Sequence, residues 1–239
     1  MSEIKTRKKT FRASCLMKAG ASAAYTAGNI MNLAPICLGA VVTGSTTVTP
    51  ASVVGIRNGM TVTAALGLTA NYTVSNLNTS AGTFSVSSAA TATSAATTLT
   101  FTANDLPKFD LSAFASPCDM VDITNVKIVS SAGAASIKLA PVLMFFDTSA
   151  VQTTVSNNTA FTPSFSVMAD NCQARIVMDS AATTFTNVGA SAYETQKADI
   201  VRPAKLDSKA CLHMVAMDTN TYLFSSTETV QFTITGIVK

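Results

Sequence analysis

The chain has 239 residues, of which 48% are apolar and only 12% are charged, and its formal net charge is +3. An average soluble domain carries about 25% charged residues, whereas disordered chains combine high net charge with little apolar content. The composition therefore excludes a disordered chain. It predicts a protein with a sizeable buried core, built as one all-β domain or as a core with a small second module.

Residues 1–10 form a polar, basic arm without periodicity, which we expect to be flexible until it is bound. The first 18 residues hold six of the 16 basic residues and one of the 13 acidic ones, leaving 16 − 6 = 10 basic against 13 − 1 = 12 acidic residues. The arm cations expected to dock on an acidic protein surface or to contact nucleic acid are Lys5, Arg7, Lys8, Lys9 and Arg12. A solvated tail that only aids solubility is the third interpretation.

The core begins with a predicted strand at 11–17 and a second apolar run at 30–38. Pro35 lies inside that second run, which indicates a sheet edge or a bulge. We therefore assign residues 11–40 to the core.

From 41 to 104 the sequence changes to short Thr/Val-rich strands separated by turns, and Arg57 is the one charged side chain between residues 19 and 104. Asn58-Gly59 is a good tight-turn signal and Ala81-Gly82 a weaker one. We interpret 41–104 as a small inserted β-module. Its uncharged surface favours association, so we expect a homo-oligomer.

Residues 105–119 form a linker that contains two prolines, and the rest of the chain alternates short apolar runs with Ser/Thr/Asn/Asp turns. In 230–235 the alternation is strict, so Val230, Phe232 and Ile234 share one face of a strand. The remaining runs of this kind are 123–129, 137–146, 173–178 and 211–217. Together they predict an antiparallel, jelly-roll-like β-sandwich formed by 11–40 and 105–239.

The module resembles a small β-module that recurs in virion proteins of tailed phages and in bacterial surface proteins. That pattern runs approximately G-x-x-V-x-G, T-x-V, L-S-x-x-A-T and L-T-F, and here Ala64 or Ala65 replaces its second glycine. The matching segments are Gly59-Met-Thr-Val-Thr, Thr73-Val-Ser, Thr83-Phe-Ser-Val-Ser-Ser-Ala-Ala-Thr and Thr98-Leu-Thr-Phe.

The flanking parts are similar to a family of small phage virion proteins, with which they share an opening, three internal segments and a last strand. The matching segments are Ala23-Ala-Tyr-Thr-Ala-Gly-Asn-Ile, Ile123-Thr-Asn-Val-Lys-Ile, Leu143-Met-Phe-Phe-Asp147, Asn157-Asn-Thr-Ala-Phe161 and Thr229-Val-Gln-Phe-Thr-Ile-Thr-Gly-Ile-Val. This resemblance implies a head decoration or cement protein of the tailed-phage capsid, with the major capsid protein as its partner.

Catalytic chemistry has little support in the sequence. The single histidine, His213, lies in a strand-like run beside Cys211 and Val215 and is expected to be half-buried, and no G-x-S-x-G motif occurs. The nearest carboxylate pairs, Asp105 with Asp110 and Asp119 with Asp122, lie in turn-rich stretches, where Asp ordinarily hydrogen-bonds nearby backbone. We therefore expect no enzyme and no cofactor.

Metal binding also has weak support. The five cysteines are an odd number without a C-x-x-C pair, which argues against a disulfide framework and a zinc site and favours small buried thiols in a reducing compartment. Asp147 and Asp218 could contribute to a calcium site, but no loop has the ligand density of an EF-hand.

Neither secretion nor membrane insertion is predicted. The basic run is followed by Thr10-Phe-Arg-Ala-Ser, which is not the apolar core of a signal peptide. The longest apolar stretch, 31–42, contains Asn32 and Pro35 and is too short to span a bilayer. We expect a protein made in the host cytoplasm and located on the virion surface.

Three functional hypotheses stay open at this point. The first is a capsid decoration subunit, and the second is a principal icosahedral coat protein whose basic arm contacts the genome. The third is a tail-fibre or adhesin component that binds glycans on exposed aromatic side chains. In the module, Tyr72, Phe84 and Phe101 all lie in strand-like runs and are expected to be core residues.

Overall fold

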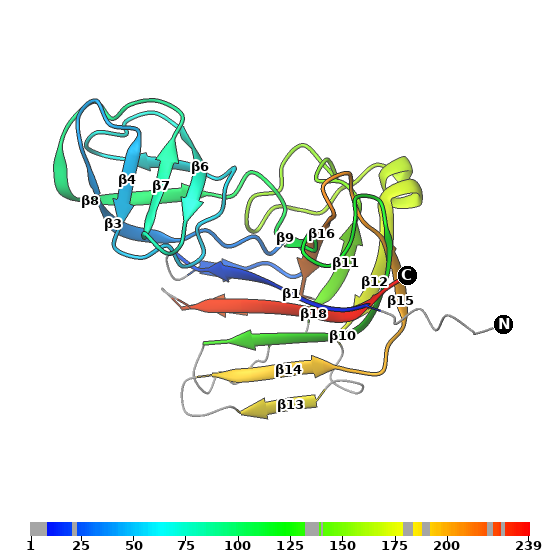
Figure 1. Cartoon of the computed structure of the whole chain (residues 1–239). Coiled ribbons are helices and arrows are strands. Elements are labelled where there is room, and N and C mark those ends of the chain that lie inside the picture. The colour runs from blue at the N-terminus through cyan, green and yellow to red at the C-terminus, as the bar shows by residue number, and fades with distance from the viewer. Residues whose placement is uncertain are drawn as a thin grey trace.

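The computed structural model describes residues 9–20, 23–131, 139, 141–178, 184–187, 192–218, 222–225 and 228–239. The described chain is nearly all antiparallel β-structure, in which a two-sheet sandwich is joined to a closed barrel (Figure 1). The predicted all-β sandwich class is confirmed.

The first sheet has the strand order β1-β18-β10-β14-β13, with β15 also paired to β10. Its strands are β1 (Lys9–Lys18), β10 (Met120–Ser130), β13 (Thr184–Asn187), β14 (Tyr193–Lys197), β15 (Arg202–Lys205) and β18 (Thr229–Val238). The last strand pairs on one side with the first strand and on the other with β10. Val230, Phe232 and Ile234 are fully buried, as the alternation predicts.

The second sheet has the order β12-β11-β16-β9. Its strands are β9 (Lys108–Asp110), β11 (Val142–Phe146), β12 (Cys172–Val177) and β16 (Cys211–Met217). In Figure 1 the strands β1, β18, β10, β14 and β13 of the first sheet run across the view, whereas β16, β11 and β12 of the second sheet stand nearly upright. The main apolar core packs between the sheets, with Leu143, Phe145 and Leu212 on the inner face of the second sheet.

Strand β11 is buried on both faces, which explains its unbroken apolar run. Val142, Met144 and Phe146 face away from the main core into a smaller cluster with Val151 and Val155 of the following loop. That loop leads to a single π-helical turn, η1 (Val167–Asn171).

The segments 23–30 and 157–161, which are far apart in the sequence, meet in space. Asn29 forms an isolated β-bridge with Ala160, and Asn158 Oδ1 accepts a hydrogen bond from the Thr26 amide at 2.8 Å. Beside them, β2 (Ala23–Tyr25) pairs with β17 (Tyr222–Phe224). These two segments therefore have a structural role, because they fasten the loop after β11 to the segment between β2 and β3.

The barrel closes in the order β3-β4-β7-β6-β5-β8. Its strands are β3 (Ile36–Val41), β4 (Thr47–Pro50), β5 (Thr61–Ala64), β6 (Tyr72–Asn78), β7 (Thr83–Val86) and β8 (Ser94–Thr102). Tyr72, Phe84 and Phe101 are buried in its interior, as predicted. The rings of Phe84 and Phe101 pack edge to face with centroids 5.7 Å apart.

The structure corrects two predicted boundaries. The barrel begins at Ile36 rather than at 41, because β3 (Ile36–Val41) is one of its strands. Pro35 directly precedes this strand and does not lie inside it. The flexible arm was predicted to include residues 9 and 10, but Lys9 and Thr10 belong to β1, where they pair with Val238 and Ile237.

The weaker of the two turn signals marks the hairpin. Ala81-Gly82 lies between β6 and β7, which pair with each other. Asn58-Gly59 forms a turn between β4 and β5, which are not neighbours in the barrel. There the Asn58 side chain accepts a hydrogen bond from the Leu77 amide, so this turn fastens β6 instead of reversing a hairpin.

We predict that Gly236→Ala strongly destabilises the sandwich. A Cβ at this position of β18 would overlap the carbonyl oxygen of Asp122 and lie 2.7 Å from the ring of Phe11. Because a backbone atom cannot move as a side chain can, we expect a loss of about 3 kcal/mol in the free energy of unfolding. Urea denaturation measures it, with Thr235→Ala as the neighbouring control. Equal stability of the two variants would contradict the packing described here.

Candidate binding site between the barrel and the sandwich

The structure places two of the five predicted arm cations. Lys5, Arg7 and Lys8 lie outside the described residues. Lys9 and Arg12 belong to β1, where Lys9 Nζ donates a hydrogen bond to the Ala113 carbonyl at 3.3 Å. Arg12 is exposed and has no partner in the described part of the chain.

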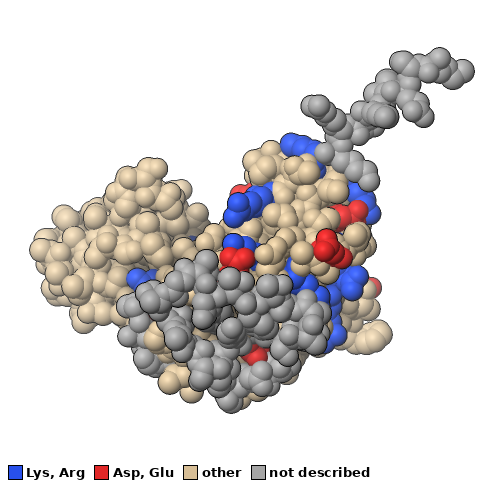
Figure 2. Space-filling view, turned by 90° about the horizontal axis from the view of Figure 1, so that it is seen from below, with Lys and Arg blue, Asp and Glu red and all other residues tan. Residues whose placement is uncertain are grey.

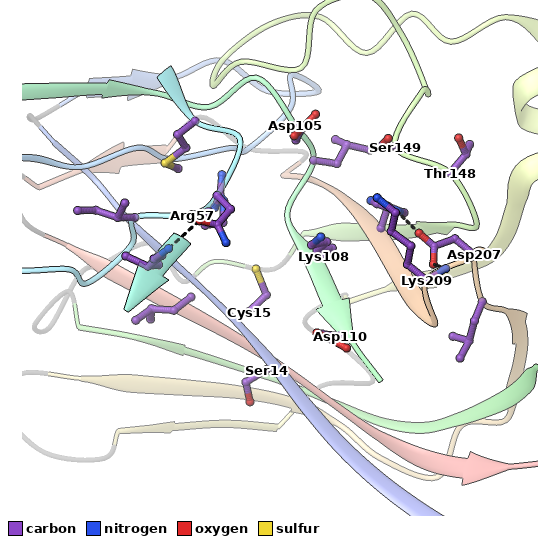
Figure 3. Close-up of a pocket in the computed structure, with 18 of the residues that line it drawn as sticks. Ser14, Cys15, Arg57, Asp105, Lys108, Asp110, Thr148, Ser149, Asp207 and Lys209 are labelled. Atoms are coloured by element: carbon purple, nitrogen blue, oxygen red, sulfur yellow. Dashed lines mark hydrogen bonds and ion pairs between the residues drawn. The ribbon is translucent and has the colours of Figure 1, made fainter. Parts of the chain in front are cut away.

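A cleft of about 1110 Å³ separates the barrel from the sandwich. One wall is the barrel segment 53–60, and another is the middle of β1 with the start of β9. Figure 3 shows Arg57 on the barrel side and Asp207 and Lys209 on the opposite side, with Lys108 between them. The sequence offered no direct signal for this cleft, since its walls come from distant parts of the chain.

Asn32 joins the two bodies at this cleft. It is fully buried, and its Oδ1 accepts a hydrogen bond from Arg57 Nη2 at 2.5 Å. Its Nδ2 donates to the carbonyls of Asp105 at 3.0 Å and Val155 at 2.6 Å, while its amide donates to Asn157 Oδ1 at 3.0 Å. One amide side chain therefore links the barrel, the linker and the loop after β11.

Arg57 carries the single charge of the barrel into this junction. Burial lowers the pKa of Arg57, and Cys15 and Asp105 act in the opposite direction. The guanidinium stays charged in either case. Its Nη1 is buried without a hydrogen-bond partner, and no carboxylate in the described residues forms an ion pair with it. An unpaired buried charge of this kind is costly.

The Asp207 carboxylate and the His213 ring form a hydrogen bond on the sandwich side, with His213 Nε2 3.0 Å from Asp207 Oδ2. His213 is 6% exposed, deeper than the half-buried position predicted. Burial alone would raise the pKa of Asp207, but hydrogen bonds from the Cys211 amide, His213 and the Lys209 amide together lower it. The pair fastens the loop before β16, and no hydroxyl or thiol among the described residues is hydrogen-bonded to His213.

The aspartates of the two candidate carboxylate pairs bind other residues instead of one another. Ser112 donates both its hydroxyl and its amide to Asp110, which lowers the pKa of Asp110. Asp119 accepts the Ser116 amide at 2.7 Å, as expected of a turn residue, and Asp122 pairs with Lys239 at 2.8 Å. The negative charge of Asp105 raises the pKa of Arg57 and has no such effect on the pKa of Asp110.

All five cysteines are free, but they are not uniformly buried. Cys15 and Cys211 are buried, whereas Cys118 is exposed, contrary to the expectation that all are small core residues. Burial raises the pKa of the Cys15 thiol. Across the described ranges, no group of three His, Cys, Asp or Glu side chains could hold a metal ion.

The described chain contains no helix of the length and apolarity needed to cross a membrane. Comparisons with protein-family models, with curated proteins and with solved structures give no match. We therefore infer a function for this chain from its own geometry.

We predict that Asn32→Ala loosens the junction. The substitution leaves Arg57 without its one observed acceptor and removes two buried donors, so we expect a loss of about 2–4 kcal/mol in the free energy of unfolding. Denaturant titration measures the loss, and small-angle scattering reports whether the barrel moves relative to the sandwich. Asn71→Ala, at an exposed position of the barrel, is the control. Unchanged stability of Asn32→Ala would contradict this role.

We predict that Asp207→Asn is less stable than the wild type at pH 7 by about 1–2 kcal/mol, because an amide poorly replaces a carboxylate that is bound to the His213 ring and to two backbone amides. The pKa of Asp207 is lower in the folded state than its ordinary value of 3.8. Its contribution is therefore complete above that value and is lost as the pH falls through the folded pKa.

The difference between wild type and Asp207→Asn should consequently narrow below about pH 4. Urea denaturation between pH 3 and pH 7 measures it, with the exposed Asp170→Asn as control. A difference that is constant over this range would contradict the lowered pKa.

Proposed function

We propose that this chain is a structural protein of a virus particle, a decoration or cement subunit that binds the outside of a phage head and bridges capsomers. Its mechanism is binding alone. The observation that carries the proposal is a closed, nearly uncharged barrel attached to a sandwich that holds almost all of the charge. Figure 2 shows this contrast, with the barrel tan except for one small blue area.

The outer surface of the barrel supports a contact role. Leu38 and Val42 on and beside β3 are 55% and 54% exposed, and Leu66 is 47% exposed. Thr98 is the strand partner of Leu38, and the barrel strands contribute no charge that would repel a neighbour. A low-charge surface with exposed apolar side chains approaches other proteins without repulsion.

Barrel closure explains how such a surface is compatible with a defined assembly. A closed sheet leaves no unpaired edge, so the barrel cannot associate without limit through strand pairing. Contacts are then restricted to side chains, which favours a specific oligomer. We propose a homo-oligomer, with a trimer as the simplest match to a local threefold axis, bound to the major capsid protein on the capsid surface.

A principal coat protein is the second candidate. The observation in its favour is that the basic character of the arm continues into β1, where Arg12 is exposed and unpaired. Such a coat protein would bind nucleic acid with an affinity that falls steeply with salt and is lost when residues 1–8 are removed. A decoration subunit would not.

The barrel aromatic residues that the glycan-binding alternative would use are buried. The three aromatic residues of the barrel would have to offer exposed platforms for sugars. Instead, Tyr72, Phe84 and Phe101 are 7%, 1% and 4% exposed.

We predict that Leu38→Lys combined with Val42→Lys lowers the copy number of this chain on virions at least tenfold, because two charges would enter an apolar contact. Each surface substitution should change the free energy of unfolding by less than about 0.5 kcal/mol. Quantitative mass spectrometry of virions assembled with the variant measures the copy number. Val201→Lys, at an exposed sandwich position, is the control. Full occupancy by the double variant would contradict the contact surface proposed here.

A further inference from the structure

The cleft exposes the edge of a sheet. Strand β1 is an end strand of the first sheet and pairs only with β18, and β9 is an end strand of the second sheet and pairs only with β16. Residues 14–16 of β1 line the cleft. Because the far side of β1 has no partner strand among the described residues, its backbone groups there are free to pair with an added strand.

The cations and carboxylates of the cleft differ in how they are bound. Asp110, Asp147 and Asp207 accept hydrogen bonds from Ser112, from Asn171 with Gln173, and from His213. In contrast, the lysines Lys108, Lys205 and Lys209 form no ion pair within the described chain. Four cations and four carboxylates line the cleft, so the two charges balance in number. They differ in that the three lysines have no ion-pair partner among the described residues, whereas three of the four carboxylates accept internal hydrogen bonds.

Arg57, on the barrel wall, is a fourth cation of the cleft without an ion-pair partner among the described residues. Its guanidinium has one hydrogen-bond partner, the neutral Asn32, and its buried Nη1 has none. A carboxylate brought into the cleft would reduce the cost of burying this charge.

The size and lining of the cleft fit a peptide better than a small ion. Its volume of about 1110 Å³ is above the range of about 300–1,000 Å³ typical of small-molecule pockets. Both apolar and charged side chains line its walls. The apolar side chains include Leu16, Val54, Ile56, Met60 and Leu77.

We propose that the cleft binds an extended, acidic peptide segment of a partner protein, which adds a strand to the free edge of β1 and places carboxylates beside Lys108, Lys209 and Arg57. Its alternate apolar side chains pack against the barrel wall. The proposal rests on the proposed function in one respect, since the partner is taken to be the shell protein to which this chain is bound.

The test uses the full chain and a synthetic probe, the acetylated and amidated peptide Thr-Val-Asp-Val-Asp-Val-Thr, with its Asn-for-Asp analogue as the uncharged match. We expect the Asp peptide to bind at least tenfold more tightly than the analogue by fluorescence anisotropy. Amide hydrogen exchange within residues 14–16 should slow at least tenfold when it is bound. Equal affinity for the two peptides, or unchanged exchange along β1, would overturn the proposal.

Two sets of variants test which cations bind the carboxylates of the peptide. Lys108→Gln with Lys209→Gln should weaken binding of the Asp peptide at least tenfold, because both side chains are exposed and the fold does not depend on them. Arg202→Gln, an exposed cation that does not line the cleft, should leave the affinity unchanged. Equal weakening by the two sets would mean that general charge attraction is being measured, which would overturn the site.

A third probe, a peptide of residues 1–8, tests the basic arm of a second copy as the occupant. Tighter binding of this peptide than of the Asp peptide would overturn the acidic partner. Failure of the proposed function is recognised separately, since it would appear as absence of the chain from virions whatever the peptides do. Virion occupancy together with no preference for the Asp peptide would overturn the cleft proposal alone.

Discussion

The architecture depends on one buried amide. Asn32 accepts the hydrogen bond of Arg57 and donates to two carbonyls from segments far apart in the sequence. Without it, close contacts such as that of Gly55 with Lys18 of β1 would be left to hold the barrel against the sandwich, and Arg57 would lose its one observed hydrogen-bond acceptor. Because an unsatisfied buried donor costs more than an average hydrogen bond contributes, this contact determines how the two bodies are held together.

The division of charge follows from the same arrangement. A closed barrel satisfies its backbone groups internally, so its outer surface can consist of hydroxyls and a few apolar side chains without inviting strand pairing. The sandwich, whose sheets keep free edges at β1 and β9, holds nearly all of the lysines and carboxylates. The uncharged barrel and the charged sandwich thus lie on either side of one cleft.

Local pattern predicted much of the fold. The run Cys211–Met217 was predicted to the residue as a strand, and the alternation in β18 placed Val230 correctly. Features that depend on distant partners were missed: the membership of β3 in the barrel, the pairing of His213 with Asp207, and the cleft itself. Asp207 lies six residues before His213 in a turn, where an aspartate usually binds backbone, so only the folded loop reveals the second partner.

The central claim is that this chain is an accessory subunit bound to a different shell protein. Its copy number in purified virions, measured by quantitative mass spectrometry against the most abundant shell protein, tests that claim most directly. The account predicts several hundred copies, a number consistent with binding throughout an icosahedral head, beside a distinct major capsid protein. If this chain is itself the main shell component, or is absent from the particle, the decoration proposal is wrong.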